Sequence, residues 1–196
     1  MKIILASNSP RRKELLGGLG VDFEVRVMKG VDEAYPDTLP AKDVAEYISR
    51  EKASVYDVAD DELLITADTV VIVGDDILGK PKDADDAHRM LREISGRIHQ
   101  VVTGVCLTTA KEQRSFSVVT DVTFKQLSDE EIDFYIRNHR PYDKAGAYGI
   151  QEWIGLVGVE SISGSFYNVM GLPVQRIYEE LTASFGLNLD NINPLQ

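Results

Sequence analysis

Several residue types are scarce in this chain of 196 residues, and each scarcity excludes a class of protein. The single cysteine, Cys106, cannot form an intramolecular disulfide or build a multi-cysteine zinc site, and its apolar surroundings predict a small buried hydrophobe. The three histidines have no metal-ligand spacing. No apolar run approaches the ~18 residues that span a bilayer, and residues 1–5 are too short a run for a signal peptide. We therefore expect a cytoplasmic protein without a membrane partner.

Positive charge is also scarce. The chain has 21 Lys and Arg against 32 Asp and Glu, for a formal net charge of −11. A protein that binds nucleic acid along a broad surface needs a basic face, and attraction to an anionic membrane needs the same sign of charge. Both classes are disfavoured. Any polyanion that binds here must do so in a local cationic pocket.

Strand-like and helix-like segments alternate along the chain. Its length fits one domain, and we expect this domain over residues 1–187 with an unstructured tail over 188–196. The glycine-rich residues 143–151 are expected to form a loop at a site rather than a core element. The pattern predicts a mixed α/β fold. Strands are predicted at residues 2–6, 23–28, 63–73, 77–78, 100–109, 116–124 and 156–162. Helices are predicted at residues 43–56, 83–95 and 128–138, and two more begin at residues 10 and 171.

Three consecutive cations stand at a predicted helix start. Ser9 is placed to cap the helix and Pro10 to begin it, so Arg11, Arg12 and Lys13 fall in the first turn. Cations there oppose the helix dipole unless an anion offsets them, and the first-turn N–H groups attract the same anion. The stretch predicts an anion site. The alternative is a solvated basic turn on the surface.

Asp68 interrupts the long apolar run of residues 63–73. A carboxylate in a buried strand is costly unless a cation or a metal ion lies beside it. Carboxylates in such settings are typical of general bases and Mg²⁺ ligands. The alternatives are a structural aspartate bonded to neighbouring N–H groups and, for the adjacent Thr69, an ordinary strand former.

Lys52 falls on the apolar stripe of its predicted helix, four residues after Ile48. It either extends to solvent at the edge of the stripe or points inward and needs an anion. Glu33 could supply a second carboxylate to a divalent ion, or be an ordinary loop acid. Gln151 could read the edge of a base, because an amide carries both a donor and an acceptor. The common explanation of these features is a phosphorylated ligand held with a divalent metal.

Ordered motifs from about residue 3 to residue 185 closely resemble the Maf family of nucleoside triphosphate pyrophosphatases. The motifs are SNSPRRKELL, REKA, ADT, GKP, SG, TGV, DKAGAYGIQ and GLP. The resemblance implies a twisted mixed β-sheet flanked by helices, with two lobes around a central cleft. It also implies hydrolysis of a nucleotide between its α and β phosphates with Mg²⁺ or Mn²⁺, and suggests a homodimer.

The resemblance also implies roles for individual residues. Asp68 matches the proton acceptor of the family, and Glu33 with Asp68 matches the positions thought to hold metal. The positions that match phosphate ligands are Ser9, Arg12, Lys52, Lys80 and Lys144.

Three further positions carry the choice of substrate within the family. Arg11, Thr69 and Gln151 match the branch that prefers dTTP and UTP, and modified pyrimidine nucleotides are a related option. The branch that acts on 7-methyl-GTP has Trp, Gln and Glu at these places. A nucleotide-sensing regulator of cell division with little turnover is the alternative outside enzymes, and the intact Asp68 argues against it.

Overall fold

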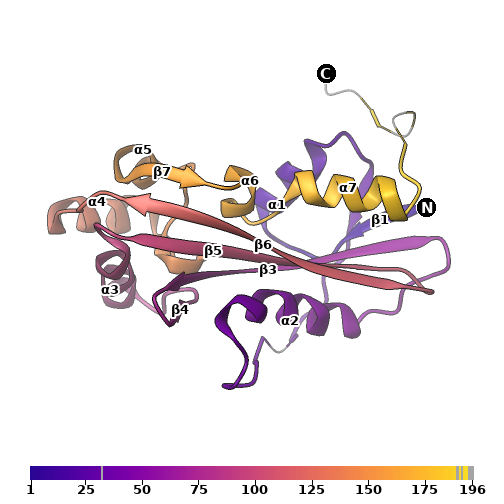
Figure 1. Cartoon of the computed structure of the whole chain (residues 1–196), viewed down its shortest axis with the longest axis horizontal. Coiled ribbons are helices and arrows are strands. Elements are labelled where there is room, and N and C mark those ends of the chain that lie inside the picture. Colours follow the sequence, from indigo (N-terminus) through magenta and orange to yellow (C-terminus); the bar gives the residue numbers. More distant parts are fainter. Residues whose placement is uncertain (32, 189, 191, 194–196) are drawn as a thin grey trace. The chain divides into compact units, whose positions relative to one another are not determined.

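The structure is a computed structural model that describes residues 1–31, 33–188, 190 and 192–193 (Figure 1). The chain divides into two units. Unit 1 comprises Met1–Asp68, Thr103–Val118 and Gly171–Gln196, and unit 2 comprises Thr69–Val102 and Val119–Met170. The elements are β1 (Lys2–Leu5), α1 (Pro10–Gly17), β2 (Phe23–Val25), α2 (Ala41–Ser54), β3 (Glu62–Val73), β4 (Asp76–Leu78), α3 (Ala84–Ile94), β5 (Ile98–Thr108), β6 (Gln113–Phe124), α4 (Asp129–His139), η1 (Ala145–Ala147), α5 (Trp153–Gly158), β7 (Val159–Ser163), α6 (Phe166–Val169) and α7 (Val174–Ser184).

The strands form a seven-stranded mixed sheet in the order β2-β1-β3-β5-β6-β7, with β4 paired to β3. β1 runs parallel to both β2 and β3, and Ile4 lies opposite Glu24 on one side and Leu64 on the other. β4 and β7 pair antiparallel with β3 and β6. The predicted mixed α/β fold is confirmed. The central cleft and the single domain over residues 1–187 stay predictions.

The core of unit 1 is built from apolar strand residues and the buried stripes of its helices. Figure 1 shows α2 on one face of the strands, and α1 and α7 on the other. Gly104 of β5 lets the backbone of α2 come close, because a Cβ at this glycine would lie 2.2 Å from the carbonyl carbon of Ala45. Cys106 packs with Ile4 and Leu64, which confirms the predicted buried cysteine.

The glycine-rich segment 143–151 corrects one prediction. It was expected to be a loop at a site rather than part of the core, but Ala147, Tyr148 and Ile150 are buried in the hydrophobic cluster of unit 2. Gly146 explains how the backbone fits there. Its φ is 67°, and a Cβ would lie 2.8 Å from the Cγ2 atom of Val71. The apolar side chains of the segment are therefore core residues, although its polar ends are not.

Other boundaries differ locally. Residues 156–162 were predicted to be one strand, but α5 takes the first part and β7 begins at Val159. Apolar periodicity over so short a run does not separate a helix from a buried strand. β2 ends at Val25, three residues before the predicted end. The capping box of Ser128 and Glu131 at the start of α4 is present as the sequence predicts.

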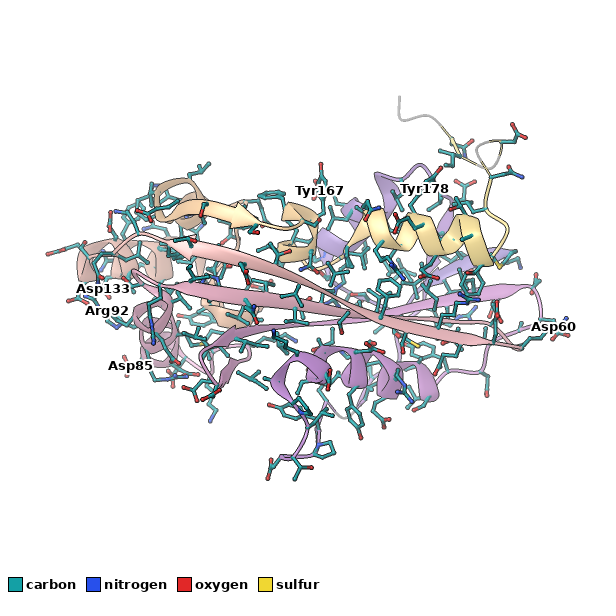
Figure 2. All side chains as sticks on the ribbon, viewed as in Figure 1. Asp60, Asp85, Arg92, Asp133, Tyr167 and Tyr178 are labelled. Atoms are coloured by element: carbon teal, nitrogen blue, oxygen red, sulfur yellow. The ribbon has the colours of Figure 1, made fainter. Side chains whose placement is uncertain are left out.

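On the surface of unit 2, α3 is joined to the start of α4. Figure 2 labels Arg92 of α3. Its guanidinium donates to the carbonyl of Leu127 at 2.9 Å and also pairs with Asp129. Such exposed pairs add little to stability.

The predicted tail, residues 188–196, lies partly outside the described residues. Within its described part, Asn193 donates its backbone N–H to the carbonyl of Gly20 at 2.8 Å. Among the residues that the structure describes, we find no helix with the length and apolar character that crossing a bilayer requires.

His99 of β5 is buried in unit 2 and should make stability depend on pH. Its Nε2 lies 2.7 Å from the Tyr148 hydroxyl, and among the described residues Nδ1 has no hydrogen-bond partner. Desolvation lowers the pKa of His99 from 6.5 to about 4. The unfolded chain therefore takes up a proton between these values while the folded chain does not. The contribution of the neutral His99 to the free energy of unfolding is fully present above pH 6.5. As the pH falls toward 4, about 3 kcal/mol of this free energy is lost.

Urea denaturation of the wild type and of His99→Gln between pH 7.5 and 4 measures this contribution. The variant should lose less stability over the interval, because an amide does not titrate. His139→Gln, a change at a partly buried histidine, is the control and should keep the steeper profile. Parallel profiles for wild type and His99→Gln would contradict the assignment.

Candidate functional site

The site in unit 1 begins at the first turn of α1. The hydroxyl of Ser9 accepts a hydrogen bond from the backbone N–H of Arg12 at 3.4 Å, and Pro10 is the first helical residue. This confirms the predicted cap. Arg11 and Arg12 are both partly buried in the turn, with no acidic residue beside them in α1's first turn. The basic turn is thus not a fully solvated surface turn.

Arg12 is held by two backbone carbonyls from distant parts of unit 1. Its Nε donates to the carbonyl of Gly171 and its Nη1 to that of Ala67, both at 2.8 Å. Desolvation lowers the pKa of the guanidinium, whereas the charges of Asp68 and Glu33 act in the opposite direction. Because Ala67 directly precedes Asp68, the hydrogen bond to Ala67 holds the guanidinium near this part of β3.

Lys52 joins the two predicted acidic residues of the site. Its Nζ lies 2.7 Å from Oδ1 of Asp68 and 2.8 Å from Oε1 of Glu33. The side chains of Lys52 and Asp68 are only 15% and 13% exposed, and that of Glu33 is 49% exposed. The inward lysine of α2 and the carboxylate in the apolar strand β3 are therefore partners, and each supplies the charge that the other needs.

A hydrogen bond between α2 and β3 positions Lys52 against Asp68. The hydroxyl of Thr66 donates to the carbonyl of Ser49 at 2.6 Å, within the buried part of unit 1. Ser49 is three residues before Lys52, and Thr66 is two residues before Asp68 on the same strand face. The bond thus brings one turn of α2 against β3 where the ammonium reaches the carboxylate. Asp68 and Thr69 are partly exposed, whereas the residues of β3 on either side of them are buried.

Glu33 and Asp68 suit a metal ion that is bound jointly by protein carboxylates and substrate phosphates. Among the described residues, no group of three or more His, Cys, Asp and Glu side chains could hold a metal ion alone. Glu33 and Asp68 do converge on a single cation, the ammonium of Lys52. Mg²⁺ is commonly bound by one or two carboxylates together with substrate phosphates. This pair suits such a shared site and not an all-protein cage.

Unit 2 holds the remaining predicted ligands. Lys144 is 8% exposed, and its Nζ lies 2.7 Å from Asp143 and 3.1 Å from Glu152. The backbone N–H of Gly146 donates to the carbonyl of Gly79 at 3.0 Å, so the GKP segment with the exposed Lys80 is bonded to the glycine-rich segment. These two motifs are therefore neighbours in unit 2.

The predicted site residues therefore fall in two groups. Unit 1 brings Arg12, Lys52 and Asp68 together with Glu33, and Ser9 caps the same turn. In unit 2, Gln151 is exposed after the buried Ile150, and Thr69 follows Asp68 directly in the chain. The sequence interpretation missed Glu152 and Tyr135, whose hydroxyl bonds to Glu152. No motif or spacing marks these two, because one looks like a loop acid and the other like a helix core residue.

The chain is similar in sequence to a known family and to several curated proteins. The family model described as Maf-like protein matches residues 2–184. A dTTP/UTP pyrophosphatase of Phocaeicola vulgatus is 63% identical over 92% of this chain and 94% of its own. A dTTP/UTP pyrophosphatase of Flavobacterium psychrophilum is 49% identical over 90% of this chain and 91% of its own.

Among solved structures, a nucleoside-triphosphatase / dITP/XTP pyrophosphatase from Mycobacterium abscessus is similar. It is 19% identical in sequence, and the match covers 65% of this chain and 76% of that structure's chain, with a TM-score of 0.39. The assignment rests on the sequence matches instead. Because the family match runs from the start of β1 to the last residue of α7, and the relatives agree over nearly their whole length, this chain belongs to the Maf family.

Proposed function

We propose that this chain is a cytoplasmic hydrolase of acid anhydrides that cleaves dTTP and UTP to the monophosphate and pyrophosphate. Membership of the Maf family and the names of the relatives support the reaction class. The observation that carries the proposal is the contact of Lys52 with Asp68 and Glu33 beside the basic turn of α1. Together these residues offer cations for phosphate oxygens and a carboxylate for water.

The basic turn binds the triphosphate in this proposal. First-turn N–H groups of α1 and the guanidinium of Arg12 are donors suited to phosphate oxygens. The ammonium of Lys52 can move from the carboxylates of Glu33 and Asp68 to contact the phosphates of the substrate when these bind. Lys80 and Lys144 keep their roles as predicted phosphate ligands.

Asp68 acts on the attacking water. Its carboxylate accepts a proton as the water oxygen forms a bond to the α phosphorus, and the bond from that phosphorus to the bridging oxygen breaks in line. Pyrophosphate leaves with the bonding electron pair. Nζ of Lys52 lies 2.7 Å from Oδ1 of Asp68 and so holds the carboxylate in place for the water.

Glu33 and Asp68 would hold the divalent cation, Mg²⁺ or Mn²⁺. When bound, the ion supplies positive charge to the phosphate oxygens. The ammonium of Lys52 already lies against both carboxylates, which supports a cation-binding role for the pair.

Arg11, Thr69 and Gln151 are proposed to choose the base. Uracil and thymine present a 4-carbonyl beside an N3–H, and an amide can pair with both. Cytosine reverses this pattern and would leave polar groups unpaired. The alternative, a 7-methyl-GTP pyrophosphatase, is disfavoured because that branch has other residues at all three positions. A homodimer stays a prediction.

The test is pyrophosphate release from dTTP, UTP, CTP, GTP and 7-methyl-GTP by the purified chain with Mg²⁺ or Mn²⁺. We expect dTTP and UTP to be cleaved fastest, with no release after chelation by EDTA. Preference for 7-methyl-GTP would overturn the branch assignment. Binding of dTTP without release of pyrophosphate from any nucleotide would favour the sensing alternative.

A further inference from the structure

Tyr135 of α4 contacts the segment that carries Gln151. The side chain is fully buried in unit 2, and its hydroxyl has two polar partners. It accepts the backbone N–H of Gly149 at 3.0 Å and donates to the carboxylate of Glu152. One buried hydroxyl therefore connects both ends of residues 149–152, which we call the Gln151 turn.

The Gln151 turn is also closed on itself and connected to Lys144. The backbone N–H of Glu152 donates to the carbonyl of Gly149 at 3.0 Å. The other carboxylate oxygen of Glu152 lies 3.1 Å from Nζ of Lys144. Tyr135, Glu152 and Lys144 thus form a continuous polar network that contacts the turn. The network therefore connects two predicted substrate ligands, Gln151 in the turn and Lys144.

The turn has little room to shift. A Cβ at Gly149 would lie 2.9 Å from the carboxyl carbon of Glu152 and 3.1 Å from Cε of Lys144. The backbone at Gly149 therefore packs directly against the side chains of Glu152 and Lys144. Burial, with the nearby carboxylate of Glu152, raises the pKa of Tyr135, so the hydroxyl keeps the proton that it donates.

We propose that Tyr135 is a positioning residue for base selection: its hydroxyl holds the Gln151 turn so that the Gln151 amide points in one direction. The proposal rests on the proposed function and on the predicted role of Gln151. Gln151 is itself exposed, so its side chain is not held by burial. A fixed backbone is the means by which an exposed amide can discriminate thymine and uracil from cytosine.

Tyr135→Phe tests the proposal because it removes only the hydroxyl. The backbone N–H of Gly149 then loses its buried acceptor, and the carboxylate of Glu152 loses a donor. The loss of both hydrogen bonds should loosen the turn. We expect the ratio of kcat/KM for UTP to that for CTP to fall about tenfold, mainly through a higher KM for UTP. Tyr148→Phe is the matched control, because that buried hydroxyl bonds to His99 and not to the turn. Its UTP-to-CTP ratio should equal that of the wild type.

A second variant keeps the test decisive if Tyr135→Phe does not fold, as judged by circular dichroism. Glu152→Gln retains the shape of the side chain and removes the charge that holds Lys144, so it should lower the same ratio. An unchanged ratio in a folded Tyr135→Phe, or in Glu152→Gln where the first variant fails to fold, would overturn the positioning role. A wild type that cleaves neither UTP nor dTTP would instead overturn the proposed function, so the two failures are distinguishable.

Discussion

Asp68→Asn is expected to lower kcat for dTTP and UTP by about 10²- to 10⁴-fold, the usual contribution of a general base. The amide keeps the size of the side chain but cannot accept the proton of the attacking water. It also removes the charge that lies 2.7 Å from Nζ of Lys52. Steady-state pyrophosphate release measures the effect, and the unfolding midpoint in urea shows whether the variant is folded.

Glu62→Gln is the matched control for Asp68→Asn. Glu62 lies at the start of the same strand, and its carboxylate also pairs with a cation, Arg26, at 2.6 Å. The arginine and the backbone N–H of Ala59 hold the pKa of Glu62 at about 2. Losing this ion pair should leave kcat close to the wild-type value. Similar kcat losses in both variants would mean that the loss at Asp68 reflects a general disturbance of β3, and an active Asp68→Asn would remove Asp68 from the reaction.

Gly104→Ala is expected to destabilise the fold by about 3 kcal/mol or more, above the usual range for an added methyl group in a core. The new Cβ would lie 2.2 Å from the carbonyl carbon of Ala45 and from the backbone nitrogen of Glu46. These are backbone atoms of α2 and cannot turn away as a side chain would. The Thr66 to Ser49 hydrogen bond holds the same helix against β3, so the clash must displace α2 or break that bond. Because α2 carries Lys52, activity should fall as well.

Urea denaturation followed by circular dichroism measures the change at Gly104. Gly17→Ala is the control in the same unit, because its Cβ would meet only the Cε1 atom of Phe23, at an ordinary 3.8 Å. Gly17 is the last residue of α1, where alanine should be neutral or slightly stabilising. A free energy of unfolding for Gly104→Ala equal to that of Gly17→Ala would show that α2 does not pack on β5 as described.

Local signals in the sequence were reliable where partners lie within one helical turn. Ser9 and Pro10 predicted the start of α1, and Ser128 with Glu131 predicted the start of α4. Their hydrogen bonds join residues three apart, so the pattern of residue types contains both partners. The spacing of Lys52 along α2 left two positions open, and its contacts with Asp68 and Glu33 show that it points inward. The strand run around Asp68 was also predicted nearly to its ends.

Short apolar segments were less predictable. Residues 143–151 are rich in glycine, which is typical of loops, yet their alanine, tyrosine and isoleucine side chains complete the core of unit 2. α5 was predicted as part of a strand, because six residues are too few to show a helical period. In both places the neighbours that bury the segment, and not its own pattern, determine its conformation.

The sequence by itself determined the chemistry available to this protein: a capped basic turn, a lysine on an apolar helix stripe, a carboxylate in an apolar strand and a run of motifs shared with one family. Only the tertiary structure decided which groups meet. Asp68 is 16 residues from Lys52 along the chain, Glu152 is 17 from Tyr135, and Gly171 is 159 from Arg12. Such pairs arise from the packing of strands and helices, whose close approach depends on positions such as Gly104. Residue type states what charge a group carries, but the fold supplies the partner that balances it.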